Sequence, residues 1–287
     1  MNSYAGLAKY ILRMSRPRFW FYLAGPVIVG ISYGATGVSE FITVPNILIF
    51  LYFLIPANVY LYGVNDIFDK DIDEHNPKKS ESGKEVIYKG NRIIDVIVAV
   101  TGVTAVCFFI ILSSQDMIPI LLFLFLGFAY SAPPFRFKTT PILDSVTNGL
   151  YILPGISAYI FLSGDLPPVS IIAGAWLWSM SMHTFSAIPD IEPDREAGIV
   201  TTATYLGERS TFAYCGVIWI LSAVLFTITN IFFAVLFVYP AVLAYIYFSS
   251  KSVSKSYWWF PYINVIIGMI LSLGGIYNTI YGQIGVF

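Results

Sequence analysis

Residues 65–73 read NDIFDKDID and directly follow an apolar span that ends near residue 64. A second acidic stretch, residues 190–196, reads DIEPDRE and follows another apolar span. Carboxylates beside a bilayer are costly to place there and are usually functional. The two stretches therefore mark where the functional site is to be sought, and the apolar spans that they follow decide the fold.

The composition is that of an integral membrane protein. Of the 287 residues, 57% are hydrophobic and 11% are charged, whereas soluble domains carry about a quarter charged residues. Apolar spans long enough to cross a bilayer lie at 19–37, 44–64, 93–112, 117–132, 142–162, 169–188, 210–229, 231–249 and 259–281. We therefore predict an all-α polytopic fold with nine transmembrane helices, in a single membrane domain that covers residues 1–287.

The basic residues indicate how these spans are oriented. All 16 Lys and Arg residues fall before the first span or in every second loop after it. By the positive-inside rule this side is cytoplasmic, so the N-terminus and both acidic stretches are expected inside and the C-terminus outside. Residues 1–18 are expected to form an interfacial helix, because apolar residues recur there at helical spacing; a cytosolic tail is the alternative.

The spacing within each acidic stretch places its carboxylates on one helix face. Asp66, Asp69 and Asp73 stand at i, i+3 and i+7, and Asp190 and Asp194 stand at i and i+4. Both sets lie on the same side of the membrane in this arrangement, so they can converge on one cavity. Oxygen ligands are those that Mg²⁺ prefers. The five aspartates therefore predict a site for two Mg²⁺ ions and a diphosphate substrate with an apolar tail.

Such a site also needs cations, because five aspartates and a diphosphate outweigh two Mg²⁺ ions. Basic residues are available in the adjoining loops, namely Arg16, Arg18, Arg136, Lys138 and Arg195. An extended backbone after Pro133 and Pro134 places Arg136 and Lys138 on one side. Asn65 adds an amide oxygen beside the first carboxylates. The alternative is that the acidic residues are solvated helix ends and the basic residues serve topology and interface anchoring alone.

Two further features have two possible roles each, and the two cysteines have one expected role. The polar stretch 65–92, which carries the first motif, is either a cytoplasmic lid over the site or a disordered connector. His183 lies seven residues before Asp190 on the same face, so it either lines the cavity or is a buried, hydrogen-bonded histidine. Cys107 and Cys215 are single cysteines within spans and are expected to be packing residues.

These motifs resemble those of the UbiA superfamily of intramembrane prenyltransferases, which carries the patterns N-D-x-x-D-x-x-x-D and D-x-x-x-D. The first is matched at residues 65–73 and the second at 190–194, and the family's tyrosine-plus-basic motif is matched at 130–138. The resemblance implies helices around a central cavity, Mg²⁺-dependent transfer of a prenyl group from a diphosphate to a lipophilic acceptor, and Tyr130 among the diphosphate-binding residues. It implies catalytic roles for Asp66, Asp69, Asp190 and Asp194.

Residues 15–20, 130–138 and 187–198 resemble, more narrowly, the lycopene elongase branch of that family. This likeness implies dimethylallyl diphosphate as the donor and lycopene as the acceptor, with C5 additions that give C45 and C50 carotenoids and, in some enzymes, hydration. A longer donor, or an aromatic quinone head, glycerol ether lipid or tetrapyrrole acceptor, remains the alternative. Partners are therefore small lipophilic molecules and the bilayer, with no nucleic acid.

Two other classes of membrane protein are alternatives: a cation-coupled transporter, and another lipid-diphosphate enzyme, which is either a phosphatidyltransferase or a phosphatase. A cation-coupled transporter is expected to carry acidic residues near the centres of its spans, and these spans lack them. Phosphatidyltransferases carry the pattern D-G-x-x-A-R, which is absent. A lipid phosphatase is distinguished by its product, because it releases inorganic phosphate rather than diphosphate.

Overall fold

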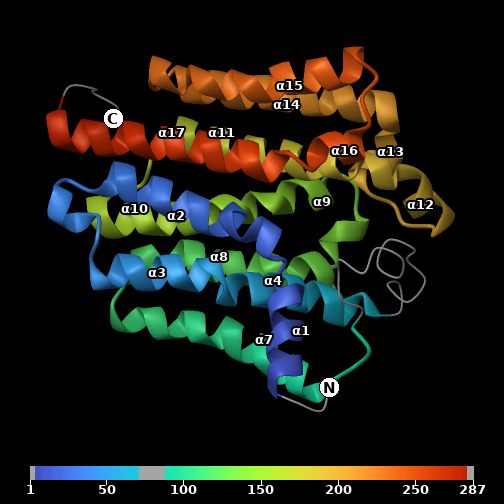
Figure 1. Ribbon diagram of the computed structural model, residues 1–287, viewed down its shortest axis with the longest axis horizontal. Helices are drawn as coiled ribbons and strands as arrows, with labels where there is room; N and C mark the ends of the chain where they lie inside the picture. The colour runs from blue at the N-terminus through green and yellow to red at the C-terminus, as the bar shows by residue number, and fades with distance from the viewer. Residues whose placement is uncertain (1–3, 71–87, 283–287) are drawn as a thin grey trace.

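The computed structural model describes residues 4–70 and 88–282, and within these ranges all regular elements are helices (Figure 1). Residues 71–87 of the expected cytoplasmic loop, which include Asp73, lie outside the described residues. The α-helices are α1 Tyr4–Met14, α2 Trp20–Gly34, α3 Val44–Leu54, α4 Pro56–Phe68, α7 Arg92–Thr104, α8 Ser114–Ser131, α9 Leu143–Val146, α10 Leu153–Ser163, α11 Val169–Ser186, α12 Ile191–Glu196, α13 Thr202–Leu206, α14 Glu208–Thr227, α15 Val238–Phe248, α16 Val253–Tyr257 and α17 Phe260–Tyr281.

Seven helical segments in the described part are long and apolar enough to cross a membrane by length and composition. They are Val44–Phe68, Arg92–Ile110, Ser114–Ser131, Leu143–Ser163, Glu208–Thr227, Ile231–Phe248 and Phe260–Tyr281. The other two expected spans coincide with α2, which has 15 residues, and α11, which carries several hydroxyl side chains and His183. The all-helical membrane fold is confirmed, and the count of nine spans stays a prediction.

The long helices lie roughly side by side, and α2 occupies the centre of the bundle (Figure 1). It packs against α3, α10 and α17, while α11 packs against α14. One apolar core gathers around α3, α4, α7, α8 and α10, and a second around α11, α14, α15 and α17; α2 contributes to both. Cys215 is buried in the second core as expected, but Cys107 is exposed, so the expectation that it is a packing residue was wrong.

Helix α1 packs its apolar stripe against the first core through Leu7, Tyr10, Ile11 and Met14. Met14 is buried, whereas Tyr4 at the other end is exposed. The helix expected in the N-terminal segment is therefore present, and its place at a membrane interface remains a prediction.

Helices α2 and α10 approach each other closely at two glycines. A Cβ atom added at Gly30 would lie 2.1 Å from the carbonyl oxygen of Gly155, and one added at Gly155 would lie 2.5 Å from that of Pro26. Small residues let membrane helices bring their backbones together in this way. The contact fixes α2, and with it the segment before α2, relative to the second half of the chain.

Both acidic motifs lie where long helices end. The segment Val44–Phe68 is interrupted at Ile55, before Pro56, and α4 then ends at Phe68. The N–H of the next residue, Asp69, donates to the carbonyl of Asn65. Helix α11 ends at Ser186 and is followed by the 3₁₀ turn Ile188–Asp190 and by α12. The short helices α9, α12, α13 and α16 gather at this same end of the bundle (Figure 1).

Candidate active site

A polar cavity of about 320 Å³ lies where the two motif-bearing helices end. Its lining includes Arg16, Tyr62, Asn65, Tyr130, His183 and Asp190. These residues come from the segment before α2 and from α4, α8, α11 and the turn after α11. Residues of both acidic motifs, Asn65 from the first and Asp190 from the second, therefore face one cavity. Asp66, Asp69 and Asp194 are not among its lining residues, so the convergence of all the motif carboxylates on this cavity stays a prediction.

Asp66 of the first motif is 2% exposed and is paired with Arg16. The Nη2 atom of Arg16 lies 3.5 Å from Oδ1 of Asp66. The same guanidinium lies 4.6 Å from the centre of the Tyr62 ring, which also lines the cavity. A buried carboxylate and a ring face thus hold this cation at the cavity wall.

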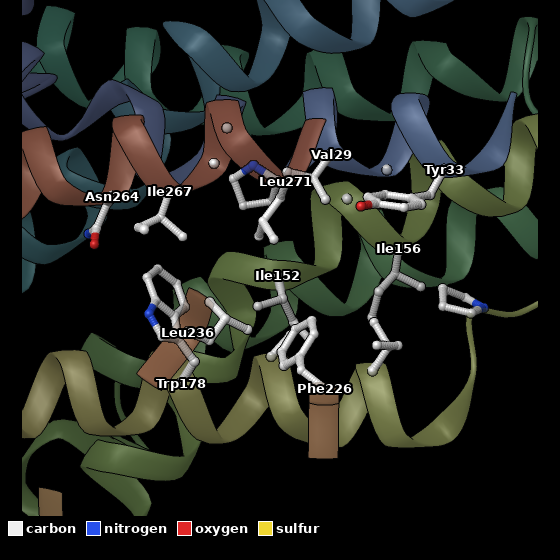
Figure 2. A pocket seen from close by; sticks show the side chains of 18 of the residues that line it. Val29, Tyr33, Ile152, Ile156, Trp178, Phe226, Leu236, Asn264, Ile267 and Leu271 are labelled. Atoms are coloured by element: carbon white, nitrogen blue, oxygen red, sulfur yellow. The ribbon is translucent and has the colours of Figure 1, made fainter. Parts of the chain in front are cut away.

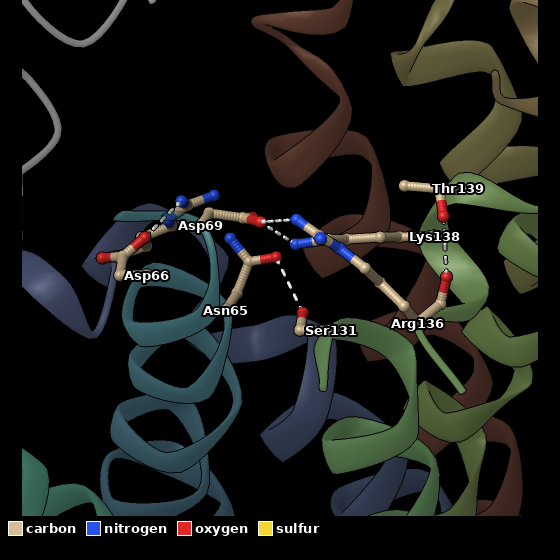
Figure 3. Close-up of polar contacts among 8 residues, drawn as sticks. Asn65, Asp66, Asp69, Ser131, Arg136, Lys138 and Thr139 are labelled. Carbon is tan, nitrogen blue, oxygen red and sulfur yellow. Dashed lines mark hydrogen bonds and ion pairs between the residues drawn. The ribbon is translucent and has the colours of Figure 1, made fainter. Parts of the chain in front are cut away.

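Asp69 faces two cations from the loop after α8 (Figure 3). Its Oδ1 atom accepts a hydrogen bond from Nζ of Lys138 and lies 3.8 Å from Nη2 of Arg136. The extended backbone expected for this loop was wrong, because Arg136 adopts a left-handed conformation and begins the 3₁₀ turn Phe137–Thr139. This turn still directs both side chains toward Asp69.

Two hydrogen bonds tie α8 to the motif-bearing helices. The hydroxyl of Ser131 donates to Oδ1 of Asn65 at 3.1 Å (Figure 3). The hydroxyl of Tyr130 lies 3.3 Å from Nε2 of His183. His183 lines the cavity and also has a hydrogen-bond partner, so it has both of the roles that the sequence offered as alternatives.

The second motif is held in place by a carboxylate that the sequence analysis did not single out. Asp144 in α9 is 1% exposed and accepts hydrogen bonds from the backbone N–H and the hydroxyl of Thr202. Asp194 in α12 is half-buried, and its carbonyl oxygen accepts from the N–H of Ile199. The loop after the second motif is thereby fastened to the start of another long helical segment. An acidic residue inside an otherwise apolar span was the available signal.

Two of the cations expected at the site contact other groups. Arg18 donates to the carbonyl oxygens of Tyr257 and Trp258, and its guanidinium lies 3.6 Å from the centre of a Trp258 ring. Burial lowers the pKa of Arg18 from its ordinary value. Arg195 is exposed; it pairs with Glu192 at 2.8 Å and donates to the carbonyl of Thr204 at 3.1 Å. Neither residue is among those that line the polar cavity.

In the described ranges, no three or more His, Cys, Asp and Glu side chains form a group that could hold a metal ion. Of the two acidic motifs, the described residues that line the cavity are Asn65, with an amide oxygen, and Asp190, with a carboxylate. Asp66 is not a lining residue, but it pairs with Arg16, which is one. This donor chemistry suits a hard divalent cation. The described aspartates of the first motif are at the same time paired with Arg16, Arg136 and Lys138.

Aromatic rings form much of the remaining wall of the polar cavity. The hydroxyls of Tyr62 and Tyr151 lie 3.5 Å apart, and the rings of Phe19 and Tyr22 meet edge to face. Tyr257 of α16 completes this group, and burial raises its pKa above the ordinary value. Sequence alone could not select these rings, because aromatic residues make up 17% of the chain.

A second, apolar cavity of about 180 Å³ adjoins the polar one and lies among α2, α10, α11 and α17 (Figure 2). Tyr22 and Trp178 line both cavities. Among the described residues, the lining of the apolar cavity includes no charged side chain. Together the two cavities can hold a molecule with a charged head and an apolar body.

Comparison with known proteins identifies the relatives of this chain. The sequence profile described as the UbiA prenyltransferase family matches residues 23–276. The chain is 52% identical over 277 residues to a lycopene elongase/hydratase of Haloarcula japonica. The match covers 96% of this chain and 94% of that protein. It is 50% identical to a lycopene elongase/hydratase of Halobacterium salinarum, over 96% of this chain and 99% of that protein.

A solved structure shares the fold. It is a UbiA homologue from Archaeoglobus fulgidus bound to GPP and Mg²⁺. The TM-score is 0.72 at 18% sequence identity, and the match covers 93% of this chain and 99% of that one. At this level of identity the likeness concerns the arrangement of the helices.

Proposed function

Because the chain belongs to the UbiA prenyltransferase family, and so is an integral membrane enzyme that transfers prenyl groups, we propose that its acceptor is lycopene. The donor in this proposal is dimethylallyl diphosphate, and one or two C5 units are added to give C45 and C50 carotenoids. Support comes from the two archaeal relatives, which share half of their residues with this chain and are named lycopene elongase/hydratase.

The observation that carries the proposal is the junction of the two cavities at Tyr22 and Trp178. A prenyl diphosphate needs a polar pocket for its head, and a carotenoid end needs an apolar pocket beside the reacting carbon. The polar cavity, which both acidic motifs face, meets the first need, and the uncharged cavity among α2, α10, α11 and α17 meets the second. Their shared wall places the two reactants next to each other.

In this proposal the diphosphate is bound by the cations that face the first motif. Arg16 lines the cavity, and Arg136 and Lys138 face Asp69 of the same motif, which is outside the cavity lining. Arginine grips phosphate oxygens in bidentate fashion, whereas lysine acts as a point charge. Asn65 and Tyr130 complete the lining toward the head group. Arg18 and Arg195, which contact other groups, hold α16 and the loop after the second motif in position.

The divalent cation is proposed to be Mg²⁺, which the solved UbiA homologue binds. The residues that would hold it are Asp66, Asp69, Asp190 and Asp194, whose donors suit a hard cation. Asp73, outside the described residues, is assigned to the same set by its spacing. We propose two ions. When bound, Mg²⁺ neutralises charge on the diphosphate and makes it a better leaving group.

The reaction breaks the bond between the allylic carbon and the diphosphate oxygen, and the bonding electrons leave with the diphosphate. The rings of Phe19, Tyr62, Tyr151 and Tyr257 line the cavity and stabilise the allylic cation by cation–π attraction. The terminal double bond of lycopene then supplies the electron pair for the new carbon–carbon bond. The cation left on the acceptor either loses a proton or takes up water.

The orientation in the membrane follows from the basic residues. Because all 16 fall on one side of the nine-span arrangement, we propose that the N-terminus and both acidic motifs face the cytoplasm and that the C-terminus lies outside. The charged donor then reaches the polar cavity from the cytoplasm, while lycopene enters from the bilayer.

The test is incubation of membranes that contain the protein with Mg²⁺, labelled dimethylallyl diphosphate and lycopene, followed by mass spectrometry of the lipid extract. The expected result is lycopene that has gained five or ten carbons, with the signal lost when EDTA is added. Labelled product on a different lipophilic acceptor, and none on lycopene, would contradict the proposed acceptor. Release of inorganic phosphate without a prenylated product would contradict prenyl transfer itself.

A further inference from the structure

A hydrogen-bonded pair of polar side chains lies in the apolar cavity. The hydroxyl of Tyr239, in α15, donates to Oδ1 of Asn264, in α17, at 2.9 Å. Both residues line the cavity, and Asn264 is the only side-chain amide among the described lining residues. Figure 2 shows Asn264 reaching from its helix into the space between the helices.

The other end of the Asn264 amide is buried, and among the described residues its Nδ2 atom has no hydrogen-bond partner. A buried donor left without a partner costs about 1–3 kcal/mol, and such a group in a native protein calls for an explanation. Leucine has nearly the same volume and would fill this position in an apolar cavity without that cost. The amide therefore indicates a ligand with a hydrogen-bond acceptor at this place.

The pair lies beside the junction with the polar cavity. The ring of Tyr239 packs edge to face against that of Trp178, with ring centres 5.7 Å apart, and Trp178 lines both cavities. A buried water needs two or more polar partners, and this pair supplies them, because Nδ2 donates and the Tyr239 oxygen has lone pairs to accept.

We propose that Asn264 and Tyr239 bind the water that hydrates the carotenoid cation, an inference that rests on the proposed function. When the new carbon–carbon bond forms, the former double bond of the acceptor is left with a tertiary cation. The oxygen of the bound water gives an electron pair to this carbon and forms a C–O bond. One water proton is released to the diphosphate that has just departed into the adjoining polar cavity. The product is a C5-extended tertiary alcohol.

The alternative is a purely structural pair that joins α15 to α17. The two readings differ in the ratio of hydroxylated product to the product formed by proton loss. A structural role affects both products together, whereas a water-binding role changes their ratio. The experiment therefore measures this ratio by mass spectrometry in water labelled with heavy oxygen, with membranes that contain the full chain.

Asn264→Leu and Tyr239→Phe are each expected to lower the ratio roughly tenfold, the effect of one lost hydrogen bond, while C5 transfer persists. Tyr33→Phe is the matched control, because Tyr33 lines the opposite end of the same cavity (Figure 2), and its ratio is expected to stay unchanged. If Asn264→Leu fails to fold, Tyr239→Phe, which keeps the ring, decides the matter.

An unchanged ratio in the variants would overturn this inference, as would wild-type product that lacks the heavy-oxygen hydroxyl. Either result leaves C5 transfer to lycopene standing. Absence of C5 transfer in the wild-type protein would instead overturn the proposed function, and this inference with it.

Discussion

Arg16 reaches across from the segment before α2 and places its Nη2 atom 3.5 Å from Oδ1 of Asp66, fifty positions along the chain. Arg18, two residues later, turns away and donates to the carbonyls of Tyr257 and Trp258. The backbone explains this divergence, because Arg16 adopts φ 49° and begins a 3₁₀ turn that ends at Phe19. Two arginines that look equivalent in the sequence therefore contact different parts of the protein, Arg16 the first acidic motif and Arg18 the end of α16.

Replacing these two arginines is expected to have distinct consequences. Arg16→Ala removes a cation from the wall of the polar cavity, so we expect turnover to fall roughly 10-fold to 100-fold, with a higher KM for the prenyl diphosphate. Arg18→Ala removes contacts to α16 and should lower the melting temperature in detergent while leaving the KM for the donor near its original value. Initial rates against donor concentration check both. Equal effects on that KM would contradict the assignment.

The aspartates of the two motifs are expected to be essential for turnover. Asp66→Asn and Asp190→Asn preserve size but remove a negative oxygen donor, so we expect a loss of about 100-fold or more in kcat. Chelation of Mg²⁺ should abolish wild-type activity, and added Mg²⁺ should restore it. Asp165→Asn, at an exposed position between α10 and α11, is the matched control. Full activity of either motif variant would argue against a carboxylate-held metal.

The convergence of the two motifs was predictable from the sequence, because helical spacing and the one-sided basic residues already placed Asn65 and Asp190 at the same membrane face. The residue that each cation contacts could not be predicted from the sequence. Arg18 contacts Trp258, which is 240 positions away, and Asp144 holds Thr202, which is 58 positions away. Contacts of this kind depend on how α2, α9 and α16 pack. No local spacing rule encodes that packing.

Lys138 and Arg136 both face Asp69, but their environments differ. The Lys138 side chain is 11% exposed, whereas that of Arg136 is 36% exposed. Removal of the more buried cation leaves Asp69 in a low dielectric with less compensation. We therefore expect Lys138→Met to lower the free energy of unfolding by about 1–3 kcal/mol and to reduce turnover. We expect Arg136→Met to lower the free energy of unfolding by less. Thermal unfolding in detergent measures the first effect, and a larger loss from Arg136→Met would contradict this ranking.

Two glycines of α2 offer a test of the helix packing. At Gly30 a Cβ atom would clash with the backbone of Gly155, whereas at Gly25 it would meet nothing within 4 Å. Overpacking of a close contact costs about 1–3 kcal/mol, so Gly30→Ala is expected to lower the melting temperature. Gly25→Ala, in the same helix, is the control and should leave it unchanged. A similar melting temperature for both variants would mean that α2 and α10 are not in close contact.

Gly25 also gives access to the acceptor pocket, because it lines the apolar cavity and has open space where a side chain would stand. A leucine there would occupy a large part of a cavity of about 180 Å³. We therefore expect Gly25→Leu to reduce C5 transfer to lycopene at least tenfold, with the protein folded and with the affinity for dimethylallyl diphosphate retained, since the polar cavity is untouched. Binding of labelled donor and product formation are measured side by side in the same membranes. Loss of both together would place the donor's tail, rather than the carotenoid end, in this cavity.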